Sequence, residues 1–160
     1  MKILGVDPGL RYTGYGLIEE KSGVVKLIEA GFVATDSRRT IETRLKRIYK
    51  ALQDLVCSCR PDVLVLEKLY SHYRHPTTAC LLGHVRGAIC LLAAQENIKL
   101  IEYGSTRIKK SMLGRGHATK SQIQHMVQMT LNLQSKKIRD DITDALALAL
   151  VHIKISRVKI

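Results

Sequence analysis

The chain has 160 residues, of which 46% are hydrophobic and 25% are charged, with 26 Lys and Arg against 14 Asp and Glu. This length suits one domain that buries about 70% of its unfolded surface, and we expect residues 1–160 to form a single domain. The absence of low-complexity runs excludes a disordered chain, and the net charge of +12 favours a polyanionic partner, although a merely basic protein has the same charge.

The sequence predicts a soluble, intracellular protein without a membrane segment. Its first residues lack the long apolar core of a signal peptide. The most apolar stretch, residues 79–94, contains His84 and Arg86 and is shorter than the roughly 20 residues that cross a bilayer. The cysteines have no zinc-site spacing, so we expect reduced thiols at Cys57, Cys59, Cys80 and Cys90.

The beginning of the chain predicts three strands in succession. Residues 2–7 form a short apolar run, and residues 15–19 and 24–34 follow as two further segments, joined near Ser22 and Gly23. Because the connections are short, we expect these strands to form an antiparallel meander.

Helical spacing begins after the meander. Apolar residues from Leu45 to Val56 recur at the interval of an α-helix, which Pro61 ends. The later elements are expected in this order: a strand at 62–67, a helix at 77–95, a strand at 99–103, and helices at 105–112, 119–131 and 141–155. Thr119 and Gln122 have the spacing of a capping box.

These elements predict a mixed α/β fold, with a five-stranded sheet flanked by helices on both faces. The first three strands are expected to be antiparallel and the later ones parallel, because the connections from the third to the fourth strand and from the fourth to the fifth are long enough for crossover helices. The carboxyl ends of parallel strands face the functional crevice, so the residues that end the first and fourth strands converge there if these strands are adjacent.

Acidic residues stand at the ends of these elements in an otherwise basic chain. Asp7 and Glu67 each end an apolar strand, and Asp141 and Asp144 lie three residues apart at the head of an apolar helix. Residues at i and i+3 project from the same helix face, and a carboxylate at a buried strand end is costly unless cations compensate it. We interpret Asp7, Glu67, Asp141 and Asp144 as the metal ligands of a nuclease.

Hard oxygen ligands favour Mg²⁺, with Mn²⁺ as a substitute. Two such ions can activate a water molecule and stabilise the leaving 3′ oxygen in phosphodiester hydrolysis. Each acid also has a structural explanation: a turn-forming residue before Pro8 for Asp7, an exposed strand end for Glu67, and a favourable helix dipole for Asp141 and Asp144. Asp140 lies beside this pair but off its face, and fits a solvated or capping role.

Motifs along nearly the whole chain resemble those of the RuvC-type Holliday-junction resolvases, members of the RNase H-like superfamily. The matching segments are residues 5–9 with 13–16, Glu67 with residues 82–87, Tyr103 with residues 109–127, and residues 141–147 with His152. The resemblance implies a structure-selective endonuclease that makes paired symmetric nicks in a four-way DNA junction during recombination and repair, leaving 5′-phosphate and 3′-hydroxyl ends.

The same resemblance implies roles for individual residues. It gives Asp7, Glu67, Asp141 and Asp144 as the catalytic metal ligands and places Lys109 and Lys120 beside the cut phosphate, with Lys109 favoured over Lys110. Tyr70 takes the position of an aromatic residue that stacks on bases, although it also fits as an anchor of its loop, and Arg74 is either a phosphate contact or a solvated arginine.

By resemblance, the protein is also expected to be a bacterial, cytoplasmic homodimer that works beside a branch-migration helicase of the RuvA and RuvB type. Two-fold cleavage needs two active sites, and the helix at 77–95 is a candidate interface because Gly83 and Gly87 allow close approach. A related nuclease for other branched or hybrid substrates and a non-catalytic DNA-binding protein are the alternatives. An actin-like ATPase is excluded, because the chain has no duplicated lobe.

Overall fold

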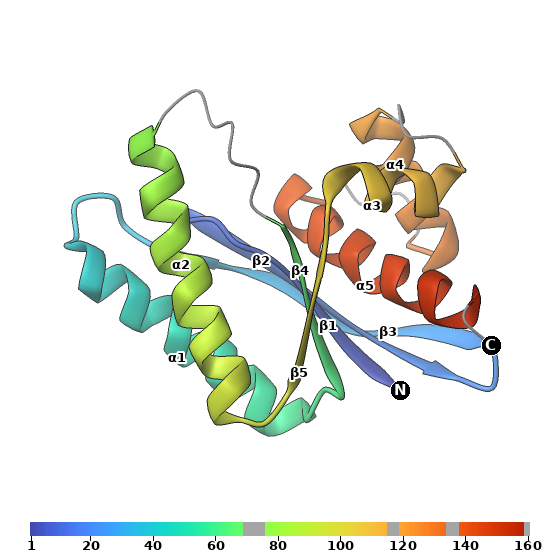
Figure 1. The fold of residues 1–160 in the computed structure, drawn as a ribbon, viewed down its shortest axis with the longest axis horizontal. Coiled ribbons are helices and arrows are strands. Elements are labelled where there is room, and N and C mark those ends of the chain that lie inside the picture. Colours follow the sequence, from blue (N-terminus) through green and yellow to red (C-terminus); the bar gives the residue numbers. More distant parts are fainter. Residues whose placement is uncertain (69–75, 115–118, 134–137, 159–160) are drawn as a thin grey trace.

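Five strands form one sheet in the order β3-β2-β1-β4-β5 in the computed structural model, which describes residues 1–68, 76–114, 119–133 and 138–158 (Figure 1). The elements in chain order are β1 (Lys2–Asp7), β2 (Tyr12–Lys21), β3 (Val24–Ala34), α1 (Ile41–Cys59), β4 (Val63–Glu67), α2 (Pro76–Gln95), β5 (Lys99–Tyr103), α3 (Ser105–Leu113), α4 (Lys120–Thr130) and α5 (Asp140–Val158). The predicted mixed sheet and its order of elements are confirmed.

The strand pairing confirms the meander and corrects one expected neighbour. β2 pairs antiparallel with β1 and with β3, and β5 pairs parallel with β4. β4, however, lies parallel to β1 and is not a neighbour of β3. The physical reason is burial: β4 is apolar and covered on both faces, which suits the centre of the sheet, whereas most residues of β3 are partly or fully exposed, as in an edge strand.

Helices cover both faces of the sheet, and the alternation of side chains divides the core into two layers. Leu4, Leu64 and their neighbours pack beneath α1 and α2. Ile3, Val63 and Leu146 belong to the other layer, beneath α3, α4 and α5. Figure 1 shows these two groups of helices on opposite sides of the sheet, so the ends of the central strands open between them.

The helix α2 combines one buried ionic contact with a largely exposed apolar surface. Arg86, only 9% exposed, donates to the carbonyl of Glu67 and to the carboxylate of Glu102 in β5. The window Thr77–Gln95 is long and apolar enough to cross a membrane by length and composition alone, so the expectation that this stretch is too short was wrong, and 28% of it is buried. Arg86 and its acidic partner fix one face of α2 to the sheet.

Element boundaries differ modestly from the predicted ones. β2 begins at Tyr12, because Thr13 is fully buried and donates to the carbonyl of Gly9, and because Gly14 pairs with Asp7. The capping box at Thr119 and Gln122 is present. The cysteines are free, as expected.

Candidate active site

The first two acids of the site lie side by side because their strands are parallel and in register. Val6 of β1 is paired with Leu66 of β4, so Asp7 and Glu67, the next residues, both leave the sheet at the same edge. This is the carboxyl edge at which α/β folds usually place their functional residues. The sequence predicted this convergence on the condition that the two strands are neighbours, and they are.

The helix α5 brings the other two acids to this edge by lying unusually close to β1 and β2. A Cβ atom added at Gly5 would lie 2.0 Å from the carbonyl oxygen of Ala145, and one added at Gly14 would lie 2.0 Å from that of Asp141. Only glycine at both positions permits this approach. The acids at the start of α5 are thereby held against the end of β1. Gly5 and Gly14 belong to the sequence motifs described above, but the sequence did not show why glycine is needed there.

Three of the four acids line a single cavity of about 260 Å³. Asp7, Glu67 and Asp144 face it together with Lys109 of α3 and Lys120 of α4. Asp141 is not a lining residue, although its backbone and Cβ border Gly14 at the same edge. Lys110 is not among the lining residues either, which supports the choice of Lys109 over its neighbour.

The carboxylates influence one another strongly. The pKa of Asp7 is raised to about 7, first by burial and then by the charges of Asp144, Asp141 and Glu67, against the opposing charge of Lys120. Burial and Asp144 likewise raise the pKa of Glu67, while Lys109 and Arg86 act against this. The edge therefore carries an excess of buried negative charge that the protein itself compensates only in part.

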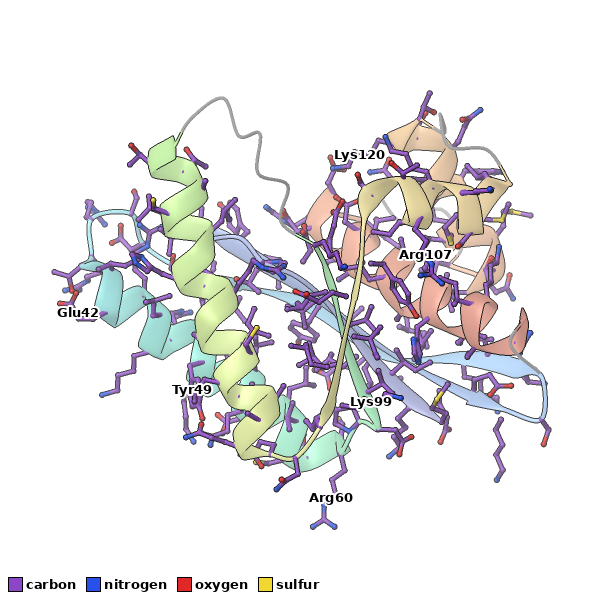
Figure 2. The ribbon with its side chains drawn as sticks, viewed as in Figure 1. Glu42, Tyr49, Arg60, Lys99, Arg107 and Lys120 are labelled. Atoms are coloured by element: carbon purple, nitrogen blue, oxygen red, sulfur yellow. The ribbon has the colours of Figure 1, made fainter. Side chains whose placement is uncertain are left out.

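Lys120 is the principal internal cation of this cavity. Its ammonium group lies 2.9 Å from a carboxylate oxygen of Asp144 and 3.2 Å from one of Asp140, and Gln124 donates to Asp140 at 2.7 Å. Burial alone would lower the pKa of Lys120, but the hydrogen bonds to Asp144 and Asp140 outweigh it and raise that pKa. Figure 2 shows Lys120 at the start of α4. Asp140, expected to be solvated or capping, is exposed in the first turn of α5 and also pairs with this lysine.

A second basic residue lies beside Asp141. Arg139 pairs with the carboxylate of Asp141 at 3.1 Å, and its guanidinium carbon lies 4.0 Å from the ring centroid of Tyr12 and 4.6 Å from that of Phe32. These rings hold the arginine at the rim of the site. No sequence pattern predicted this contact, because Tyr12, Phe32 and Arg139 are separate in the chain and meet only in the folded structure.

The donor set fits a divalent cation of the Mg²⁺ type. All the acids offer hard carboxylate oxygens, and burial together with the neighbouring acids raises the pKa of Asp7, so a bound cation would favour its ionised form. Within the described residues, no three acidic, His or Cys side chains are close enough to hold one ion as they stand. In this structure Asp144 pairs with Lys120 and Asp141 pairs with Arg139.

Two predicted DNA contacts, Tyr70 and Arg74, lie outside the described residues. His152 has a structural environment, as its distance along the helix from Asp144 suggests. Its Nδ1 forms a 2.8 Å hydrogen bond with the hydroxyl of buried Tyr103, and burial lowers its pKa.

Comparison with known proteins identifies a consistent set of relatives. The family described as "Crossover junction endodeoxyribonuclease RuvC" matches residues 3–152. The crossover junction endodeoxyribonuclease RuvC of Rhodopirellula baltica is 45% identical over 148 residues, which cover 92% of this chain and 83% of that protein. The corresponding protein of Alkaliphilus oremlandii is 40% identical over 152 residues, covering 95% of this chain and 92% of the relative.

Solved structures agree in fold. Thermus thermophilus RuvC superimposes with a TM-score of 0.90 at 28% identity, covering 99% of this chain and 97% of the other. T. thermophilus RuvC in complex with a Holliday junction substrate superimposes with a TM-score of 0.93 at 28% identity, covering 99% and 96%.

Proposed function

Because the chain belongs to the RuvC family of crossover junction endodeoxyribonucleases, and is therefore a Holliday junction resolvase of DNA recombination and repair, we propose that it cuts DNA at the cavity lined by Asp7, Glu67 and Asp144. Asp141 is the fourth acid of the proposed site. The observation that carries this proposal is the convergence of Asp7, Glu67 and Asp144 on one cavity that Lys109 and Lys120 also line.

Asp7, Glu67, Asp141 and Asp144 would hold Mg²⁺, two ions per site, with Mn²⁺ as a substitute. Bound ions would supply the Lewis-acid chemistry that activates a water molecule and stabilises the leaving oxygen. The protein contributes the fixed positions of Asp7 and Glu67 on adjacent strands and the approach of α5 that the glycines allow.

The reaction is hydrolysis of a phosphodiester bond. The oxygen of water bonds to phosphorus, the bond from phosphorus to the 3′ oxygen breaks, and the products are a 3′-hydroxyl and a 5′-phosphate. Lys120 and Lys109 line the cavity and would contact the phosphate that is cut. Entry of a phosphate gives Lys120 an anionic partner other than Asp140 and Asp144, which frees these acids.

Contacts with the rest of the junction are proposed for two residues outside the described part of the chain. Tyr70 is proposed to stack on a base, an interaction worth roughly 1–3 kcal/mol, and Arg74 to contact a phosphate. Both roles come from sequence resemblance.

We further propose a homodimer, because paired symmetric nicks require two active sites related by a two-fold axis. The exposed apolar surface of α2 supports this assignment: Leu91 is 54% exposed, and among the described residues nothing lies within 4 Å of a Cβ atom added at Gly83 or Gly87. A second copy of α2 would cover this surface.

The remaining proposals follow from family membership. The 160 residues would act as one nuclease domain, in the bacterial cytoplasm and at the nucleoid, on junctions delivered by a branch-migration helicase of the RuvA and RuvB type. No residue of this chain is assigned to the helicase contact.

The test of the catalytic assignment is cleavage of a synthetic four-way junction in Mg²⁺ by the wild type and by Asp7→Asn. We expect paired nicks from the wild type and none from Asp7→Asn, with junction binding retained. The matched control is Asp54→Asn, which changes the same atoms in an exposed pair with Lys50 and should cut normally. Cleavage by Asp7→Asn at the wild-type rate would refute the proposed site, and cutting of linear duplex or of an RNA–DNA hybrid in preference would move the substrate to another branch of the superfamily.

A further inference from the structure

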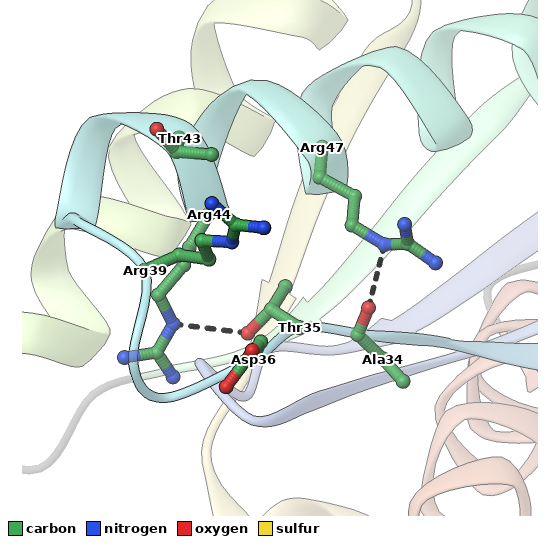
Figure 3. Close-up of a pocket in the computed structure, with 7 residues that line it drawn as sticks. All are labelled: Ala34, Thr35, Asp36, Arg39, Thr43, Arg44 and Arg47. Carbon is green, nitrogen blue, oxygen red and sulfur yellow. Dashed lines mark hydrogen bonds between the residues drawn. The ribbon is translucent and has the colours of Figure 1, made fainter.

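A second cavity, of about 660 Å³ and with a basic lining, lies where β3 leads into α1. It is lined by Ala34, Thr35, Asp36, Arg39, Thr43, Arg44 and Arg47 (Figure 3). The charged residues of this lining are three arginines and one acid, and we call the cavity the arginine pocket. Its residues are distinct from those that line the cavity of the active site.

Hydrogen bonds to a threonine hydroxyl and to two backbone carbonyls hold two of these arginines in place. The Nε of Arg44 donates to the hydroxyl of buried Thr35 at 3.0 Å, and one of its terminal nitrogens donates to the carbonyl of Leu10 at 3.1 Å. The Nε of Arg47 donates to the carbonyl of Ala34 at 2.6 Å. Figure 3 shows both side chains extending from α1 toward the end of β3. Among the described residues, the terminal nitrogens of Arg47 and the whole side chain of Arg39 form no hydrogen bond with protein, so they are available to a ligand.

The excess positive charge of the pocket favours an anionic ligand. Its one acid, Asp36, is paired with Arg38 at 3.0 Å, and hydrogen bonds from that arginine hold the pKa of Asp36 below its usual range. Glu42 in the first turn of α1 is exposed and is not a lining residue. Forked guanidinium groups suit the planar, multidentate recognition of phosphate oxygens.

The position of the pocket identifies which phosphate it meets. The amide of Thr35 donates to the carbonyl of Arg11 at 3.0 Å, and Arg44 reaches Leu10, so the pocket is built against the connection that directly follows Asp7. It therefore lies on the same edge of the sheet as the carboxylates, but on the side of α1 and α2. A DNA arm that leaves the active site in this direction passes over the three arginines.

We propose that the arginine pocket binds a backbone phosphate of the junction arm next to the cut, and so anchors that arm at a distance from the catalytic acids. The inference rests on the proposed function, because it takes a junction cut at Asp7 as its starting point. Since phosphate contacts carry no sequence information, the pocket contributes to affinity and orientation equally for all junction sequences.

The test measures binding of a fluorescent four-way junction without divalent ions at several salt concentrations. The variant Arg39→Ala/Arg47→Ala removes two exposed arginines and leaves Arg44 to support the loop. The control Lys26→Ala/Arg60→Ala removes the same charge from exposed positions at the far end of the sheet, and Figure 2 shows Arg60 at the opposite end of α1 from Glu42.

We expect the pocket variant to bind the junction about tenfold more weakly, with a slope of log K against log salt reduced by about 1. The control should shift binding by less than about twofold. Equal weakening by the pocket variant and the control would overturn the proposal. Arg47→Lys keeps the charge and the fold but removes the fork, so an intermediate loss is expected and an unchanged affinity would count against the pocket.

A scan of the junction with single neutral methylphosphonate linkages locates the contact. At one arm position, neutralisation should weaken binding by the wild type and not by Arg39→Ala/Arg47→Ala. The absence of such a position would refute the anchor. Cleavage by the wild type in Mg²⁺ is measured in parallel, so that the two proposals can fail separately. If the wild type cuts the junction but the pocket variant binds it as tightly as the wild type does, the pocket proposal alone is overturned. If binding depends on the pocket but the wild type does not cut, the proposed active site alone is overturned.

Discussion

The carboxyl group of Asp7 shows how a single residue links this site to stability. Its pKa is raised from 3.8 to about 7, first by burial and then by Asp144, Asp141 and Glu67. Between these two pH values the folded protein holds a proton that the unfolded chain has lost. The free energy of unfolding of the metal-free protein is therefore expected to fall as the pH rises from about 4 to about 7, and to level off above that.

Asp7→Asn is expected to remove this dependence, because the amide has no charge to bury. Without metal, the variant should exceed the wild type in free energy of unfolding by up to about 4 kcal/mol above pH 7 and by little at pH 4. Urea unfolding with a chelator at several pH values measures the gap, and Asp54→Asn should show none. A gap that is constant with pH would contradict the buried-charge explanation. Added Mg²⁺ should stabilise the wild type and leave Asp7→Asn nearly unchanged.

Arg86 is expected to position Glu67 rather than to contact DNA. Its guanidinium joins the carbonyl of Glu67 to the carboxylate of Glu102, so Arg86→Met breaks the link between α2, β4 and β5. We expect a loss of roughly 2–3 kcal/mol in stability, measured by urea unfolding, and a lower cleavage rate with unchanged junction affinity. Arg86→Lys should recover part of both properties. Weakened binding with normal stability would instead indicate a DNA contact.

At this scale the sequence singled out the acids but not the ion pairs that they form. Asp7 and Glu67 were recognisable because each ends a local apolar run. Side-chain directions decide the other contacts: the ion pair of Arg139 with Asp141, the ion pair of Lys120 with Asp140, and the hydrogen bonds of Arg86. No local pattern encodes those directions.

Among the elements, α5 packs most closely against the sheet, at Gly5 and Gly14. Gly14→Ala would place a Cβ atom 2.0 Å from the carbonyl oxygen of Asp141, so the start of α5 must move away from the sheet. We expect a destabilisation of about 1–3 kcal/mol or more and a large loss of cleavage, because Asp141 moves with its backbone. Thermal melting and junction cleavage test this.

The matched control for Gly14→Ala is Gly104→Ala. A Cβ atom added at Gly104 meets nothing within 4 Å, so its stability and cleavage should stay close to the wild type. Normal cleavage by Gly14→Ala would show that α5 tolerates displacement and that the close approach is not needed for the site.

Strand pairing sets the limit of prediction for the elements. Apolar periodicity located every strand, and connection lengths predicted the parallel pair of β4 and β5. Length alone did not show that the chain crosses from β3 to the far side of β1, since a crossover helix permits either neighbour. The decisive signal was the continuous apolar run of β4, which requires cover on both faces.

For the whole molecule, composition predicted a partner but not a binding surface. The net charge of +12 indicated a polyanion. The arginine pocket, however, is lined by residues within 34–47 and is anchored by a hydrogen bond from Arg44 to the carbonyl of Leu10 in the connection after β1, so only the fold locates it.

The exposed face of α2 carries the last prediction, which concerns assembly. Leu91 is 54% exposed on a helix whose other face is fixed to the sheet by Arg86, so Leu91→Glu should place a charge in the proposed dimer interface. Sedimentation should give the wild type twice the 17.9 kDa of one chain, and the variant the mass of one chain at the same concentration. Val24→Glu, at a residue 57% exposed at the start of β3, makes the same kind of change in charge and hydrophobicity and should remain dimeric.

A monomeric variant should nick the two junction strands independently rather than together, because each active site then acts alone. A wild type that sediments as a single chain would refute the dimer, and a dimeric Leu91→Glu would move the interface to another surface.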